Sequence, residues 1–255
     1  MNNIIQPFLM ALTLLTRLPV TRFIAAQWSS THYRYSAYYY PLVGAGIGAV
    51  LMLLVTILPA GVSPLLEAAL VLMVWVVASG ALHLDGLADS ADAYFAAHKN
   101  SEKALLIFKD PVSGPMAIVA VFLVLSLKLA ALASLGLWLL PALFVAPILA
   151  RAAALVLMNA TAYARADESD GIAKGLTTPA GYVTWLVVAA SCVAAVVVLP
   201  FSIGAIVVAV VALLTYWWRN LWLKLISGFT GDCLGALIEI CEAAVLVTVA
   251  IVSLY

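Results

Sequence analysis

The chain alternates long apolar stretches with shorter polar ones. A helix needs about 20 apolar residues to cross a bilayer, and several stretches come close to that length. They run over 41–58, 65–82, 116–140, 142–162, 181–198, 203–218 and 234–254. We therefore predict an all-α, polytopic integral membrane helical bundle of about seven transmembrane helices, forming one catalytic domain over 1–255. A further apolar stretch, 4–20, contains Pro7 and ends at Arg17 and Pro19, so it either lies in the interface or forms an eighth span.

Composition supports a membrane class. Hydrophobic residues make up 66% of the chain and charged residues only 9%, and the mean hydropathy is +1.15. These values lie far outside the usage of soluble domains. The formal net charge is zero, so no basic surface indicates nucleic acid, and the expected surroundings are the lipid bilayer. A homo-oligomer is compatible with this pattern. Cys192, Cys233 and Cys241 lack metal-ligand spacing and are expected to be reduced core residues.

The basic residues predict an orientation. If every predicted span crosses, the polar stretches 17–36, 83–114, 163–180 and 219–232 share one side. Ten of the twelve Lys and Arg residues lie in these stretches, and the other two are Lys128 and Arg151. Because cytoplasmic loops carry an excess of Lys and Arg, we expect this side to face the cytoplasm.

The first candidate site follows directly on the apolar stretch 65–82. Asp85, Asp89 and Asp92 stand at i, i+4 and i+7, which places them on one face if 83–97 is helical. Neighbouring acids repel one another, so something cationic should neutralise them. Oxygen ligands suit Mg²⁺, which completes its shell with water and substrate phosphates. The alternative is an ordinary solvated acidic face.

A second acidic cluster lies near the C-terminus, at the start of the last predicted span. Asp232, Gly235, Glu239 and Glu242 stand at i, i+3, i+7 and i+10, again on one helix face. Buried carboxylates without partners are costly in a membrane. We expect a metal ion shared with the first cluster to neutralise them.

Three cations are candidates for binding a diphosphate. Lys128 and Arg151 lie near the middle of predicted spans, where a charge costs at least about 2.5 kcal/mol and usually faces the bundle interior. The alternative for both is snorkelling to the interface. Lys109 precedes a Pro/Gly turn at a helix start, a position we favour for function over simple positive-inside flanking.

Two acidic faces with flanking cations favour metal-assisted phosphoryl transfer, which requires charge neutralisation and positioning. One carboxylate or His83 is the candidate general base. An ion-coupled membrane transporter with intramembrane carboxylates is the rival from another class. No inverted repeat is evident, and the acids cluster at span ends rather than at the midplane, so the enzyme is favoured.

These motifs resemble the cobalamin synthase family, the adenosylcobinamide-GDP ribazoletransferases. The likeness rests on His83–Asp92 (HLDGLADSAD) and Thr230–Ala236 (TGDCLGA) with Glu239, and it continues through 15–20 (LTRLPV), 40–44 (YPLVG) and 109–111 (KDP). It implies a Mg²⁺-dependent transferase of late cobalamin biosynthesis in the bacterial inner membrane, with its active site facing the cytoplasm. The hydroxyl of α-ribazole or its 5′-phosphate would attack the cobinamide-side phosphorus of adenosylcobinamide-GDP and release GMP. Where the family often carries a polar residue after the KDP motif, this chain has Val112, to which we assign no phosphate contact.

The hypothesis assigns each acidic and basic residue a role. The metal ligands are Asp85, Asp89, Asp92 and Asp232, with Glu239 as a further ligand or an orienting residue. The catalytic set is Asp85, His83 and Lys109, although His83 could instead cap the span end. Substrate phosphate is assigned to Lys109, Arg151 and Lys128.

A CDP-alcohol phosphotransferase is the second hypothesis within the same chemistry. Those enzymes carry a D-x-x-D-G-x-x-A-R run, of which Asp85–Asp89 offers only part. The cobalamin synthase family is therefore preferred.

Overall fold

The structure is a computed structural model that describes residues 2–20, 30–97, 100–108, 110, 112–164 and 181–254. Across these ranges the regular structure is helical, and the strand-like pairing is limited to one isolated bridge between Tyr163 and Phe229. The predicted all-α class is confirmed.

The helices follow the apolar stretches closely. In chain order they are α1 (Asn2–Leu15), α2 (Ser30–Ser36), η2 (Ala37–Tyr39), α3 (Tyr40–Ile57), α4 (Pro64–Ser79), α5 (Leu82–Ala96), α6 (Ser101–Ile107), α7 (Pro115–Ser134), η3 (Gly136–Trp138), α8 (Leu139–Ala160), α10 (Tyr182–Val198), α11 (Phe201–Ile226) and α12 (Gly231–Val252). Each of the seven predicted spans corresponds to one of these helices.

Not every predicted span is a straight crossing. Among the described residues, five helical stretches are long and apolar enough to cross a bilayer, or six if the bent pair α4–α5 counts as one. The pair turns by 86° at its break. Helix α10 has 17 residues and α1 has 14, both shorter than the roughly 20 residues that a perpendicular crossing requires. The protein is thus a polytopic membrane protein with fewer full-length spans than the apolar pattern predicts.

Helix α11 is longer than the apolar pattern predicts. The expected span ended at 218, whereas the helix continues to Ile226. Its buried stripe explains the extension, because Trp218, Trp222 and Ile226 recur every four residues and all lie in the core. The polar residues between them, Arg219, Asn220 and Lys224, lie outside the core, and they lower the mean hydropathy so that the apolar pattern ends the helix too early.

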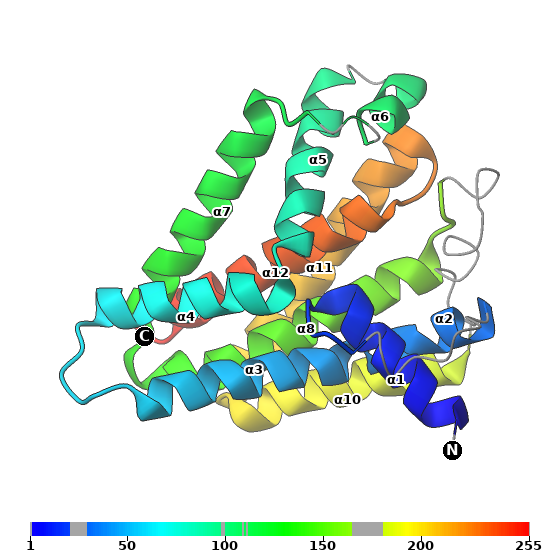
Figure 1. Cartoon of the computed structure of the whole chain (residues 1–255). Helices are drawn as coiled ribbons and strands as arrows, with labels where there is room; N and C mark the ends of the chain where they lie inside the picture. Colours follow the sequence, from blue (N-terminus) through cyan, green and yellow to red (C-terminus); the bar gives the residue numbers. More distant parts are fainter. Residues whose placement is uncertain are drawn as a thin grey trace.

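Helix α8 forms the centre of the bundle and is buried along most of its length. Figure 1 shows α3 and α10 running alongside it, and α5 rising away from α4. A Cβ added at Gly48 of α3 would lie 2.7 Å from the carbonyl oxygen of Leu143 in α8. Gly44, one turn earlier, packs equally closely against Pro147. The absence of side chains at these two positions lets α3 and α8 pack closely.

Candidate active site

A sharp turn presents the first acidic helix. Gly80 and Ala81 adopt left-handed backbone conformations with φ of +61° and +56°. The backbone N–H of Ala81 donates to the carbonyl of Val76 at 3.0 Å, which satisfies an orphan carbonyl at the end of α4. The chain then begins α5 in a new direction, so the acids are carried away from the line of the apolar helix.

Two glycines bring α5 and α12 together. A Cβ added at Gly86 would lie 2.7 Å from the backbone oxygen of Asp232, and one at Gly235 would lie 3.2 Å from Cα of His83. Each glycine stands on one helix and faces the backbone of the other. The contact therefore brings the two acidic motifs side by side, although the motifs are far apart in sequence.

The acids near this contact form one electrostatic group. Asp85 is exposed, while Asp89 and Asp232 are half-buried. The negative charges of Asp232, Asp85 and Asp92 all act on Asp89. Thr230 caps α12 by accepting a hydrogen bond from the backbone N–H of Cys233 at 3.3 Å, which places Asp232 in the first helical turn.

Asp92 has a structural contact that the sequence reasoning did not foresee. Its carboxylate accepts hydrogen bonds from the backbone N–H groups of Gly114 and Ala117, the latter at 3.0 Å. These are orphan donors at the start of α7, so Asp92 caps that helix from α5. Its assignment to the metal stays a prediction.

Lys128, Arg151, Glu239 and Glu242 form a buried network of charges. Lys128 Nζ lies 2.5 Å from Oε2 of Glu239 and 2.5 Å from Oε2 of Glu242. The other oxygen of Glu242 accepts a hydrogen bond from Arg151. None of the four side chains is more than 5% exposed. The network therefore ties α7 and α8 to α12.

This pairing has consequences for the predicted roles. Lys128 also lies 4.9 Å from the ring centroid of Trp75 in α4, a cation–π distance. In this arrangement the glutamates neutralise both cations, and neither Lys128 nor Arg151 depends on a substrate for a partner. Their assignment to phosphate, and that of Glu239 to a metal, stay predictions. The sequence places Glu242 in the second acidic cluster without a site role of its own, and the structure pairs it with both cations.

His83 lies on α5 beside the network and is 4% exposed. A terminal nitrogen of Arg151 lies 3.5 Å from Nδ1 of His83. Because a guanidinium only donates, Nδ1 is the acceptor and a neutral ring carries its proton on Nε2. That nitrogen is buried, and the described part of the protein offers it no hydrogen-bond partner.

The structure supports a metal site only in part. Lys109 lies outside the described residues. Within the described ranges, no three His, Cys, Asp or Glu side chains are already arranged to hold an ion. The mutual repulsion around Asp89 and the all-oxygen donor set nevertheless fit a hard divalent cation, which would draw Asp85, Asp89 and Asp232 closer together.

The protein is a polytopic membrane protein, because several of its helices are long and apolar enough to span a bilayer. Its acidic site, where α5 meets α12, is suited to acting on phosphorylated substrates. The chain belongs to the family described as cobalamin-5-phosphate synthase, whose model matches residues 7–250.

Curated relatives agree over nearly the whole length. A protein of Pseudomonas syringae pv. syringae (strain B728a) is 42% identical over 251 residues, covering 96% of this chain and 99% of its own. One from Pseudomonas paraeruginosa (strain DSM 24068 / PA7) is 42% identical over 254 residues, covering 98% and 100%. One from Stutzerimonas stutzeri (strain A1501) is 39% identical over 247 residues, covering 96% and 98%. All three are named adenosylcobinamide-GDP ribazoletransferase. No solved structure matches the chain.

Proposed function

We propose that this protein joins adenosylcobinamide-GDP to α-ribazole, or to its 5′-phosphate, and releases GMP. The product is adenosylcobalamin or its 5′-phosphate. Family membership over residues 7–250 supports the reaction. The structural observation that carries it is the contact of Gly86 with Asp232, because it gathers acids from two distant motifs at one place.

Mg²⁺ is the cofactor that the acidic group suits best. Asp85, Asp89 and Asp232 would hold it, and Asp92 would contribute only through the lone pairs left by its two backbone hydrogen bonds. When bound, the ion supplies charge neutralisation at the diphosphate. Glu239 would act indirectly, by holding Lys128 in place.

Asp85 is the preferred general base. It is exposed and stands in the first turn of α5, where a hydroxyl of α-ribazole has access to it. His83 is less suited in the observed state, because its acceptor nitrogen already faces Arg151. The role that remains for His83 is to donate from Nε2 to a phosphate oxygen, and Lys109 stays a candidate for binding substrate phosphate.

The proposed location is the bacterial inner membrane, with the acidic site facing the cytoplasm. The distribution of Lys and Arg supports this orientation. GDP-activated substrates are charged and water-soluble, so a site that opens at the cytoplasmic end of the bundle gives them direct access.

The test is GMP release by purified protein in liposomes supplied with Mg²⁺, adenosylcobinamide-GDP and α-ribazole. We expect GMP to appear only when α-ribazole is present, and EDTA to abolish it. Parallel reactions with α-ribazole 5′-phosphate establish which acceptor gives the higher kcat/KM.

Two outcomes would overturn the proposal. Release of CMP from a CDP-alcohol donor, with no reaction of adenosylcobinamide-GDP, would assign the protein to the CDP-alcohol phosphotransferases. Absence of both reactions, in protein that is folded and inserted, would favour the ion-coupled transporter.

A further inference from the structure

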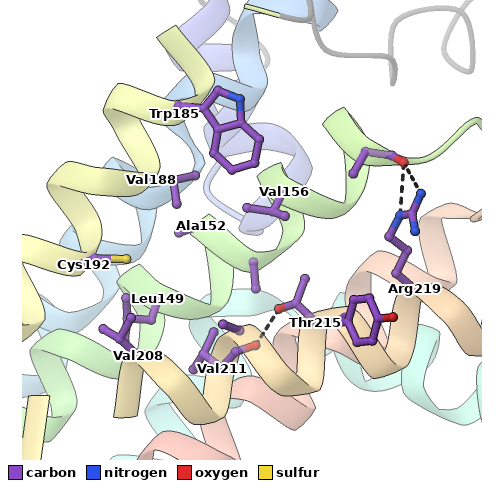
Figure 2. A pocket seen from close by; sticks show the side chains of 14 residues that line it. Leu149, Ala152, Val156, Trp185, Val188, Cys192, Val208, Val211, Thr215 and Arg219 are labelled. Atoms are coloured by element: carbon purple, nitrogen blue, oxygen red, sulfur yellow. Dashed lines mark hydrogen bonds between the residues drawn. The ribbon is translucent and has the colours of Figure 1, made fainter. Parts of the chain in front are cut away.

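A cavity lies away from the acidic site, between α8, α10 and α11. It has a volume of about 410 Å³ and is lined almost wholly by apolar side chains. Figure 2 shows Leu149 and Ala152 of α8, Val188 and Cys192 of α10 and Val208 of α11 around it. The proposed reaction makes no use of this cavity.

One end of the cavity is polar. Arg219 and Tyr216 of α11 and Trp185 of α10 line it there, and the Tyr216 and Trp185 side chains are 67% and 56% exposed. Trp185 lies one turn from the start of α10, and Arg219 lies two turns before the end of α11. Trp and Tyr beside a basic residue are typical of a membrane interface. The cavity thus extends from the interface into the apolar layer.

At this end of the cavity, Arg219 uses only some of its N–H donors within the protein. Its Nε and one terminal nitrogen donate to the carbonyl of Ala160, at 3.1 and 2.9 Å (Figure 2). A guanidinium has five N–H donors, so the rest are available to an anion at the mouth. No acid is among the residues that line the cavity, and no carboxylate within the described ranges forms an ion pair with Arg219.

We propose that this cavity binds one molecule of an anionic phospholipid. An acyl chain fills the space between α8, α10 and α11, and the phosphate accepts hydrogen bonds from Arg219. Three features favour this ligand: the positive charge of Arg219 at the mouth, the apolar lining of the cavity, and the position of the mouth at the membrane interface with the lining inside the apolar layer. It is independent of the proposed reaction.

The test is native mass spectrometry of the delipidated full-length protein in detergent. Phosphatidylglycerol and phosphatidylcholine with identical acyl chains are the two probes. We expect one phosphatidylglycerol to bind more tightly than phosphatidylcholine. Arg219→Gln should weaken phosphatidylglycerol about fivefold and phosphatidylcholine less, because the choline cation already offsets the charge of the same phosphate group. Ala212→Trp, which fills the cavity from an exposed wall position, should weaken both lipids.

Lys224→Gln is the matched control. Lys224 is an exposed cation on the same helix that does not line the cavity, so its loss should leave binding unchanged. Equal losses for Lys224→Gln and Arg219→Gln would overturn the proposal, as would wild-type lipid binding in Ala212→Trp.

If Ala212→Trp instead abolished α-ribazole-dependent GMP release while lipid binding persisted, the cavity would be a substrate site. Arg219→Lys retains the charge, and loss of preference for phosphatidylglycerol in that folded variant would also count against the proposal.

Discussion

At the scale of single residues, the charges divide into two groups with different environments. Asp85, Asp89 and Asp232 reach the surface, where an ion and a diphosphate have access. Glu239 and Glu242 lie in the core and are matched by two buried cations. The sequence spacing predicts both acidic faces, but it does not reveal that the second face is divided, with Asp232 accessible at its start and Glu239 and Glu242 buried further along α12.

Replacing Asp85 by Asn should abolish turnover without unfolding the protein. The amide keeps the shape of the carboxylate but binds Mg²⁺ weakly and does not accept a proton, so we expect kcat/KM to fall about 100-fold or more. GMP release measures the loss, and size-exclusion chromatography in detergent verifies the fold. Glu102→Gln, at an exposed acid on α6 to which no role is assigned, is the control. Near-normal turnover in Asp85→Asn would remove the acidic helix from the mechanism.

Replacing Glu242 by Gln should strongly destabilise the protein. Each oxygen of Glu242 accepts a hydrogen bond from a different buried cation, and breaking a buried ion pair by removing one partner costs about 3–5 kcal/mol. Thermal unfolding in detergent measures the effect. The control is Glu102→Gln on α6, where the acid is exposed and the change should stay within about 0.5 kcal/mol. Equal stability of the two variants would show that the network contributes nothing.

At the scale of helices, the contact of α5 with α12 depends on the absence of side chains. Gly86 faces the backbone of Asp232, and Gly235 faces the backbone of His83. The acidic spacing correctly predicts helix α5 and helix α12. The 86° turn before α5 could not be predicted, because Ala81 holds a positive φ that its residue type disfavours.

Gly86→Ala should therefore lower both the activity and the stability of the protein. The added methyl group pushes Asp232 away from α5, and a displacement of about 1 Å in a positioned group can cost about 10²-fold in rate. We expect kcat/KM to fall about 10- to 100-fold, with about 1–3 kcal/mol lost in unfolding. Gly46→Ala on α3, where a Cβ would meet nothing within 4 Å, is the control. Full activity of Gly86→Ala would show that turnover does not depend on the close contact between the two acidic motifs.

At the scale of the whole molecule, the hydropathy pattern predicts the fold class and the positions of the apolar helices better than their geometry. Every predicted span is a helix, because apolar residues in lipid must satisfy their own backbone hydrogen bonds. Whether such a helix crosses the bilayer is a separate property. The 16 residues of α4 and the 17 of α10 show that an apolar stretch can be helical and still be too short for a perpendicular span.

The orientation of the bundle can be tested by labelling single cysteines in a background without Cys192, Cys233 and Cys241. We expect Glu102→Cys on α6 to react with an impermeant maleimide only from the cytoplasmic side. Ala60→Cys, in the exposed turn between α3 and α4, should react only from the opposite side. Labelling of both positions from the same side would contradict the topology inferred from the positive charges.

The buried network also bears on how the protein is made. Chains are synthesised from the N-terminus, so α7 and α8 leave the ribosome with Lys128 and Arg151 before α12 exists. Each cation costs about 2.5–3.5 kcal/mol to place at a helix centre in lipid, and the carboxylates of Glu239 and Glu242 arrive only with the last helix. The C-terminal helix is therefore the element that completes the neutralisation of both cations. A nascent chain that lacks α12 keeps two unneutralised charges in the membrane, so insertion of α7 and α8 becomes fully favourable only when synthesis ends.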